Sequence, residues 1–288
     1  MLGISKNLMK KIKNAFISVY DKTNLRLILN SLEKYNIKII SSGGTHKKIM
    51  TLGFKSKDVS EFTNFPEMLS GRVKTLHPKI HAGILNRRNN FDKKQMREHN
   101  FENIDLVIVN FYPFEKNLMQ TKNHSKIIEN IDIGGPTMVR AAAKNYNDVT
   151  VITSTEQYSE LIDQLKKNKG STSLEFRKRM SQTAFSETAY YDSLIVDYFN
   201  RESKIFFPQK KIIHGNLVEK LRYGENPHQQ SAIYSQTQND VIKKIHGKDL
   251  SYNNYNDIFS ALAISKSFPK NTGTVIVKHA NPCGVSIN

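Results

Sequence analysis

The stretch IKIISSGGT, residues 37–45, decides the fold class of this chain. Its first half is a short run rich in isoleucine, which is typical of a strand buried on both faces. Its second half carries a Gly-Gly pair that leads into a helical pattern ending near Gly53. A buried strand that turns at once into a helix is the building block of a layered α/β domain.

Further runs of the same kind lie on both sides of this stretch. Residues 15–20, 106–110 and 149–153 are short and rich in Ile and Val, so we predict a strand at each. Residues 25–32 carry one apolar stripe at helical spacing, and residues 158–165 carry another behind a capping-box pair, with Gly170 as the stop. This alternation predicts a parallel sheet with helices on both faces.

The rest of the chain indicates a second, smaller domain. A helical pattern from residue 174 to about 199, as one helix or two abutting ones, closes the first domain, and Pro208 interrupts the stretch that follows. We place the domains at residues 1–203 and 204–288. The second should hold a helix at 257–268 and a strand at 274–277 followed only by a loop, so we expect it to be incomplete.

Composition excludes several classes of protein. The 288 residues are 38% hydrophobic and 24% charged, enough for a buried core, and no apolar run reaches the ~18 residues of a membrane span. The single cysteine, Cys283, excludes a disulfide framework and a multi-cysteine zinc site, and we expect a cytoplasmic protein. A formal charge of +17 favours anionic partners, nucleic acid or phosphorylated small molecules, although drift in a Lys-rich composition explains it as well.

Two segments that follow predicted strands are candidates for phosphate binding. Ser42-Gly43-Gly44-Thr45 opens a helix, where free amides and the helix dipole attract anions. The alternative is an ordinary tight turn with Thr45 as the helix cap. Lys22 follows the first strand at the same sheet edge, either to assist the phosphate or as an exposed helix-start residue.

The basic segment GRVKTLHP, residues 71–78, offers two kinds of cation. Arg72 is a planar fork for phosphate or carboxylate, and Lys74 is a point charge able to stabilise an oxyanion. His77 and His81 are four residues apart, but Pro78 should break the helix that would align them, so we predict no metal site there. A solvated basic loop is the simpler interpretation.

Three further segments carry chemistry-bearing side chains. Tyr112 ends the third strand as a proton donor or as an aromatic cap on the core, and Asp132 precedes a Gly-Gly-Pro helix start as a candidate base. In the second unit, Arg222 could hold phosphate, and Lys278 beside His279 forms a general-base pair at a strand end. Cys283 as a nucleophile has no base visibly placed for it.

At these residues the sequence resembles the bifunctional purine-biosynthesis enzymes that join IMP cyclohydrolase to AICAR transformylase. The matching strings run in the family's order along essentially the whole chain: SVYDKT, SSGGT, FPEMLSGRVKTLHPKIHAGIL, NFYPF, IDIGGPTMVRAAAKN, LRYGENPHQ, GKDLSYNN and VKHANPCG. The resemblance implies a methylglyoxal-synthase-like α/β cyclohydrolase domain. The incomplete start of an α/β transformylase domain should follow it.

The resemblance also implies the reaction and its partners. The cyclohydrolase closes formyl-AICAR to IMP with loss of water and without a cofactor, and the transformylase takes 10-formyltetrahydrofolate as co-substrate for AICAR. The partners are these phosphorylated nucleotides, with no nucleic acid, membrane or metal, and the family is a homodimer. The chain has Asn24 where the family usually has glycine, which a turn should tolerate, and it lacks the rest of the transformylase, so we expect a fragment.

The family's functional residues carry over by motif. The ring-closing set would be Lys74, Tyr112, Asp132 and Lys144, and the formyl-transfer pair Lys278 and His279. The substrate-binding set would be Ser18, Lys22, Ser42, Gly43, Gly44, Thr45, Arg72, Thr75, Asn110, Gly134, Gly135, Arg222 and Tyr223.

Two other functions stay open at this point. A non-catalytic nucleotide-sensing domain of the same fold would keep the phosphate site and need none of the ring-closing set. A nucleic-acid-binding module would lose affinity steeply with salt, but no aromatic platform clusters with the lysines.

Overall fold

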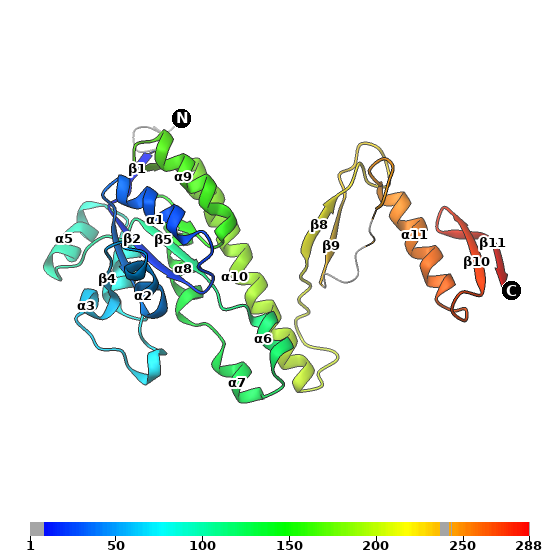
Figure 1. Ribbon diagram of the computed structural model, residues 1–288, viewed down its shortest axis with the longest axis horizontal. Coiled ribbons are helices and arrows are strands. Elements are labelled where there is room, and N and C mark those ends of the chain that lie inside the picture. The colour runs from blue at the N-terminus through cyan, green and yellow to red at the C-terminus, as the bar shows by residue number, and fades with distance from the viewer. Residues whose placement is uncertain (1–8, 237–241, 243, 288) are drawn as a thin grey trace. The chain divides into compact units, whose positions relative to one another are not determined.

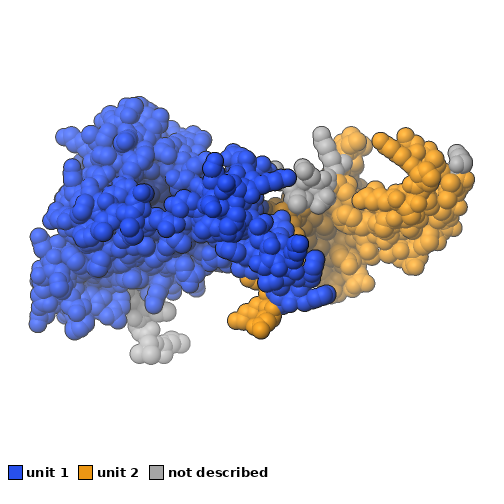
Figure 2. Space-filling view, turned by 90° about the horizontal axis from the view of Figure 1, so that it is seen from below, with its two compact units in different colours: residues 1–208 blue, residues 209–288 orange. Residues whose placement is uncertain are grey.

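The structure is a computed structural model that describes residues 9–236, 242 and 244–287. It divides into two compact units, residues 1–208 and 209–288 (Figures 1 and 2). The predicted domain boundary after residue 203 lies just beyond the last helix of unit 1, which ends at Glu202.

A five-stranded sheet forms the centre of unit 1, with the strands in the order β4-β3-β2-β5-β6. Every neighbouring pair is parallel, as predicted. Two further strands, β1 and β7, form a separate antiparallel pair. The strands are β1 Met9–Lys11, β2 Asn14–Val19, β3 Lys38–Ser41, β4 Lys57–Asp58, β5 Leu106–Asn110, β6 Thr150–Ile152 and β7 Ser171–Ser173.

Helices cover both faces of this sheet (Figure 1). On one face α1 packs against α9, and on the other α8 packs against α4 and α10. The helices of unit 1 are α1 Leu25–Lys34, α2 Gly43–Thr51, α3 Val59–Thr63, α4 Pro78–Leu85, α5 Asn90–Glu98, α6 Phe114–Gln120, α7 His124–Glu129, α8 Gly134–Lys144, α9 Tyr158–Lys167 and α10 Leu174–Glu202, with short 3-10 turns at Leu69–Gly71 and Thr155–Gln157.

The predicted strands and helices of unit 1 are confirmed. Phe16 and Ile17 in β2 and Val107 and Ile108 in β5 are at most 1% exposed, which is the two-sided burial that the apolar runs predicted. The capping box at Ser154 is present, and the long helical pattern is one helix, α10. Asn24 adopts a left-handed conformation with φ of 57°, so it serves in place of glycine.

Two local expectations are wrong. Ser42, not Thr45, is the cap residue of α2, because the Thr45 hydroxyl is bonded to the β2 backbone instead. Pro78 does not break a helix but begins α4, where its missing N–H costs nothing, and the His77 side chain caps that helix by accepting from the Lys79 N–H.

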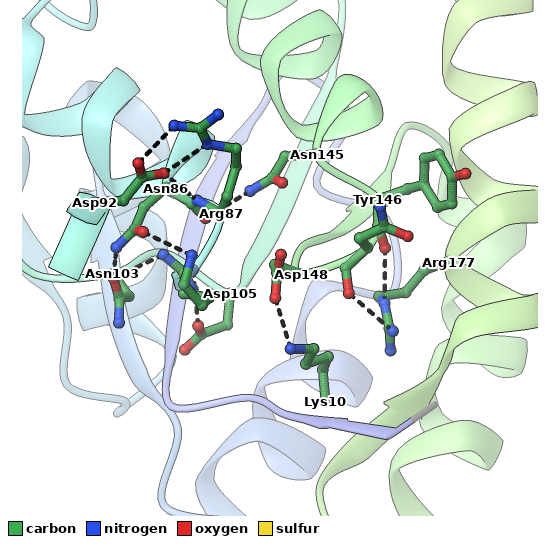
Figure 3. A network of polar contacts seen from close by, with 12 residues as sticks. Lys10, Asn86, Arg87, Asp92, Asn103, Asp105, Asn145, Tyr146, Asp148 and Arg177 are labelled. Carbon is green, nitrogen blue, oxygen red and sulfur yellow. Dashed lines mark hydrogen bonds and ion pairs between the residues drawn. The ribbon is translucent and has the colours of Figure 1, made fainter. Parts of the chain in front are cut away.

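Parallel strands give the sheet two chemically distinct edges. At the carboxyl edge, the chain leaves β3 and enters α2. The helix α8 begins at the same edge. At the amino edge, α4 and α8 end and the chain enters β5 and β6. Figure 3 shows the polar network that fills the amino edge.

The amino-edge network satisfies its own buried groups. The wholly buried Arg177 donates to the carbonyl oxygens of Tyr146, Asn147 and Thr172 at 2.8, 3.1 and 2.5 Å. Figure 3 shows Arg177 beside Tyr146. Asn145 donates to the carbonyl oxygens of Ile84 and Asn86 at 2.8 and 2.9 Å. These side chains therefore join α10, β7, the end of α4 and the segment that follows α8 into one scaffold.

Unit 2 consists of two hairpins and a helix. The antiparallel strands β8 Asn216–Lys220 and β9 Ala232–Ser235 form one hairpin, and β10 Gly273–Lys278 and β11 Asn281–Ile287 form the other. The helix α11, Tyr252–Ser265, contacts the second hairpin. The helix and the strand at 274–277 are confirmed, but the expectation that only a loop follows is wrong, since the chain turns back and pairs as β11.

Candidate active site

The register of the sheet gathers small polar side chains at the carboxyl edge. Ile17 in β2 lies opposite Ser41 in β3, so the next residues along the two strands are neighbours. The hydroxyl oxygens of Ser18 and Ser42 are 3.5 Å apart. Both residues belong to the predicted substrate-binding set, and the structure brings them together.

Thr45 attaches the start of α2 to the end of β2. Its hydroxyl accepts from the Val19 N–H and donates to the Val19 carbonyl, each at 3.0 Å. The Ser42 side chain makes no capping hydrogen bond to α2. The start of α2 is therefore fixed to the end of β2 through Thr45. The first amides of α2 receive no hydrogen bond from a capping side chain, so they are free to bind a phosphate.

Lys74 reaches this helix start from a distant loop. A Cβ atom on Gly43, whose φ is +52°, would lie 3.1 Å from the Lys74 ammonium nitrogen, so the lysine rests against the glycine backbone. The ammonium group is paired with the Glu67 carboxylate at 2.6 Å and is only 18% exposed. The structure thus places the Lys74 cation beside the predicted phosphate-binding segment, Ser42–Thr45.

Thr75 joins the same loop to the start of α8. Its side chain is buried, and its hydroxyl oxygen occupies the space that a side chain at Gly134 would need. Only glycine permits this approach. Because Lys74 and Thr75 are consecutive, one short segment bridges the starts of α2 and α8.

Asp132 lies at the start of α8. Its carboxylate accepts from the Gly135 N–H at 2.9 Å, and its own N–H donates to the Tyr191 hydroxyl at 2.8 Å. Burial raises the pKa of Asp132, while the Gly135 hydrogen bond opposes the shift. A partly buried carboxylate with a raised pKa beside a helix start is suited to accept a proton.

Asn110 and Tyr112 stand at the end of β5. The Asn110 amide accepts from the Tyr20 and Asp21 N–H groups at 2.7 and 2.9 Å and donates to the Asp21 carbonyl at 3.0 Å. These contacts shape the loop after β2, which is a structural task. The Tyr112 ring is half exposed and packs 4.9 Å from the Tyr20 ring, so it does not cap the core.

Two predicted phosphate ligands are engaged elsewhere. Arg72 forms a two-pronged pair with Glu129 of α7, at 3.2 and 2.8 Å. The Lys22 ammonium donates to the carbonyl of Tyr20, two residues before it, at 3.0 Å. The described contacts therefore do not join either cation to the Ser42–Thr45 segment.

The structure does not bring Lys144 to the other ring-closing residues within one chain. Lys144 is the last residue of the 11-residue helix α8, so it lies about 15 Å along the helix axis from the end that carries Asp132. It faces the amino edge, where it lines a cavity of about 520 Å³ with Met96 and His99. The expectation that all four residues converge is wrong for the single chain, because α8 crosses the sheet.

The two histidines of the basic segment lie at α4, His77 as its cap residue and His81 within it. No group of three or more His, Cys, Asp or Glu side chains placed to hold a metal occurs among the described residues. Burial lowers the pKa of His81, opposed by a hydrogen bond to the Thr75 backbone that attaches this ring to the bridging segment.

In unit 2 the predicted pairs lie in turns. The Arg222 guanidinium stacks on its neighbour Tyr223, 4.8 Å from the ring centre. Lys278 ends β10, and His279 begins the tight turn into β11 with φ of 53°, so the pair stands at a hairpin turn rather than at the edge of a parallel sheet. The roles of these four residues stay predictions.

Sequence reasoning missed two residues of this site. Glu67 pairs with Lys74, and Tyr191 of α10 holds the Asp132 backbone. Glu67 lies inside a matching string and was visible as part of it, but nothing in its spacing predicts an ion pair seven residues away. Tyr191 is 59 residues from Asp132, so only the tertiary fold reveals its contact.

Comparison with protein families matches most of the chain to two family models, which meet inside unit 1 rather than at its boundary with unit 2. A family model described as an MGS-like domain matches residues 25–137. A second, described as AICARFT/IMPCHase bienzyme, matches residues 142–288.

Individual proteins show the same similarity. The chain is 45% identical to the bifunctional purine biosynthesis protein PurH of Bradyrhizobium diazoefficiens, with 96% of this chain and 54% of the relative covered. It is 46% identical to PurH of Acetivibrio thermocellus, with 96% and 55% covered. The chain thus spans about half the length of the curated relatives that it matches.

A solved structure is similar as well. The crystal structure of ForH superposes with a TM-score of 0.59 at 27% identity, covering 65% of this chain and 99% of that chain. No helix of the described residues has the length and apolar character needed to span a membrane.

Proposed function

Because the chain belongs to the AICARFT/IMPCHase bienzyme family, we propose that unit 1 is an IMP cyclohydrolase. It closes formyl-AICAR to IMP with loss of water. The observation that carries this proposal is the segment Lys74–Thr75, which bridges the starts of α2 and α8 beside a partly buried carboxylate. A phosphate site, a cation and a base therefore lie around one edge of one sheet.

The first requirement of the reaction is to hold the substrate. The phosphate lies at the start of α2, on the Ser42–Thr45 segment, with Ser18 beside it. Both reacting groups, the carboxamide nitrogen and the formyl carbon, belong to the same molecule. The enzyme therefore gains mainly by holding the conformer in which these two atoms meet.

The second requirement is to manage protons and charge. The carboxamide nitrogen attacks the formyl carbon, forming a C–N bond and leaving negative charge on the formyl oxygen. Asp132 accepts the amide proton, and Lys74 with the first amides of α8 stabilises the oxyanion. Tyr112 protonates the oxyanion to a hydroxyl group, and the proton held by Asp132 then goes to that hydroxyl, which leaves as water. As the C–O bond breaks, the nitrogen that carried the formyl group gives its proton to the Tyr112 phenolate and a C=N bond forms. Lys144 has no part in this step within one chain, because it lies at the other end of α8.

The reaction transfers no electrons, so the cyclohydrolase needs no cofactor. By the same family membership we assign unit 2 to an AICAR transformylase that uses 10-formyltetrahydrofolate, and we place the protein in the cytoplasm as a homodimer. The bifunctional names of the curated relatives support the assignment of a second activity to unit 2. The nucleotide contacts of unit 2 would fall to Arg222 and Tyr223, and formyl transfer to Lys278 and His279.

Ring closure of synthetic formyl-AICAR, followed by absorbance, tests the proposal. Lys74→Ala should lower kcat/KM about 100-fold or more, because it removes the cation that faces the developing charge. Lys93→Ala is the matched control, since Lys93 is an exposed lysine of α5. Normal turnover by Lys74→Ala would remove this lysine from the site. Binding of IMP without any turnover of formyl-AICAR would favour a nucleotide-sensing domain instead.

A further inference from the structure

The loop between α3 and α4 has an unusual backbone beside the candidate site. Leu69, Ser70 and Gly71 follow one another with φ of 50°, 53° and 93°, a conformation that residues with a side chain rarely adopt. Leu69 is 66% exposed, so burial of its side chain does not hold the loop in this shape. A contact elsewhere in the loop has to do so.

Glu67 supplies that contact. One carboxylate oxygen of Glu67 lies 2.6 Å from the Lys74 ammonium, and the other lies 2.5 Å from where a Cβ of Gly71 would be. The loop thus folds back over its own glycine and delivers a carboxylate to the cation. The other nearby carboxylate, that of Asp58, is engaged by the Ser60 amide and hydroxyl at 2.9 and 2.6 Å.

The position of this pair matters more than its strength. Lys74 is the cation that rests against Gly43 at the start of α2, where an anionic ligand would bind. Glu67 is 47% exposed, and an ion pair open to water is weak and readily exchanged. A ligand phosphate at the start of α2 and the Glu67 carboxylate therefore compete for one ammonium group.

We propose that Glu67 is an internal counter-ion that a phosphate-bearing ligand displaces from Lys74, and that Glu67 thereby sets the affinity of this site. The proposal rests on the proposed function for the identity of the ligand, a phosphorylated nucleotide. Without ligand, Glu67 holds Lys74 in place. With ligand, its negative charge opposes binding until the loop moves away.

Binding measurements on the full chain test this competition. Glu67→Gln removes the charge at nearly constant size and should tighten the binding of inorganic phosphate and of IMP about threefold to tenfold by calorimetry. Glu61→Gln is the matched control, because it removes the same charge from the exposed first turn of α3 and should change affinity less than twofold. Unchanged or weaker binding by Glu67→Gln would overturn the proposal.

A double-mutant cycle separates competition from simple repulsion. If Glu67 acts through Lys74, then Glu67→Gln should change phosphate affinity less than twofold in a Lys74→Ala background. An equal gain in both backgrounds would show repulsion through space and would also overturn the proposal.

Failure of the proposed function gives a different result. If wild-type protein binds phosphate but does not close formyl-AICAR, and Glu67→Gln still binds phosphate more tightly, the cyclohydrolase is excluded and the counter-ion stands. If ring closure is normal but Glu67→Gln gains no affinity for phosphate or IMP, the counter-ion is excluded and the cyclohydrolase stands. Absence of phosphate binding by every variant excludes the counter-ion.

Discussion

The two edges of the central sheet use similar polar residues in opposite ways. At the amino edge, the Arg177 guanidinium donates to three backbone carbonyls and joins three segments of chain: α10, β7 and the loop between α8 and β6. At the carboxyl edge, the Lys74 ammonium instead pairs with the half-exposed carboxylate of Glu67. A buried cation bonded to backbone carbonyls stabilises the fold, while one paired with a half-exposed carboxylate can exchange that carboxylate for a ligand.

The largest effect that we expect is at the amino edge. Arg177→Met should lower the free energy of unfolding by about 3–5 kcal/mol, because it leaves three buried carbonyl oxygens without a donor. Urea unfolding measures this loss. The exposed neighbour Lys178 provides the control, and Lys178→Met should cost less than about 0.5 kcal/mol. Wild-type stability in Arg177→Met would mean that the network is not the scaffold described here.

At the carboxyl edge, Asp132→Asn should lower activity and raise stability. Ring closure should slow about 100-fold or more, because the amide cannot accept a proton. The free energy of unfolding at pH 7 should rise, since burial raises the pKa of Asp132 and makes its ionised form unfavourable in the folded state. The Asn side chain can still accept from the Gly135 N–H. A variant that is both less stable and inactive would contradict a dedicated catalytic role.

Gly134→Ala tests the bridge between α2 and α8. The added methyl group collides with the Thr75 hydroxyl, so we expect about tenfold lower kcat/KM and a loss of about 1–2 kcal/mol in stability. Gly44→Ala is the stability control, because a Cβ at Gly44 meets nothing within 4 Å. Thr75→Ala should restore stability to Gly134→Ala. If Gly134→Ala and Gly44→Ala were equally stable, the contact between Gly134 and the Thr75 hydroxyl would not be tight.

The smallest effect that we expect is a difference in pH dependence: the ring-closure rate should report the carboxyl edge, and the acid sensitivity of unfolding should report the amino edge. Ring closure should decline as the pH falls through the raised pKa of Asp132, because a base acts only when ionised. Asp92, paired with Arg87 near the amino edge, has its pKa lowered from 3.8 to about 2 by the hydrogen bonds from that arginine. Its stabilising contribution is therefore complete above pH 3.8 and is lost as the pH falls toward 2.

Asp92→Asn separates these two titrations. The variant should keep the acidic limb of the ring-closure rate while losing part of the acid sensitivity of unfolding. If Asp92→Asn shifted the pH at which the ring-closure rate declines, that decline would not come from the titration of Asp132 at the carboxyl edge.

Much of unit 1 could be predicted from local patterns. Apolar runs marked β2, β3, β5 and β6, and helical stripes marked α1 and α9, because periodicity over ten residues reports burial directly. Strand β4, with two residues, is too short to show a pattern, and β11 was missed because Pro282 and Gly284 are unusual in a strand.

The candidate site was predictable in part. Ser18 and Ser42 were expected together because the carboxyl ends of parallel strands meet at one edge, and they lie together. Lys144 was grouped with Asp132 because the family resemblance implies one ring-closing set, yet an 11-residue helix carries them to opposite edges. Residues close in sequence are close in space only when the element between them does not cross the sheet.

The amino-acid sequence by itself determined the order of strands and helices, the glycines at the starts of α2 and α8, and the family to which the chain belongs. These are local properties, since each depends on side-chain type and spacing within a few residues. Only the tertiary structure decided that Glu67 reaches Lys74, that Thr75 fits against Gly134, and that Arg72 turns to Glu129. Such pairings depend on how distant loops pack over the sheet edge, and packing is settled by the whole chain at once.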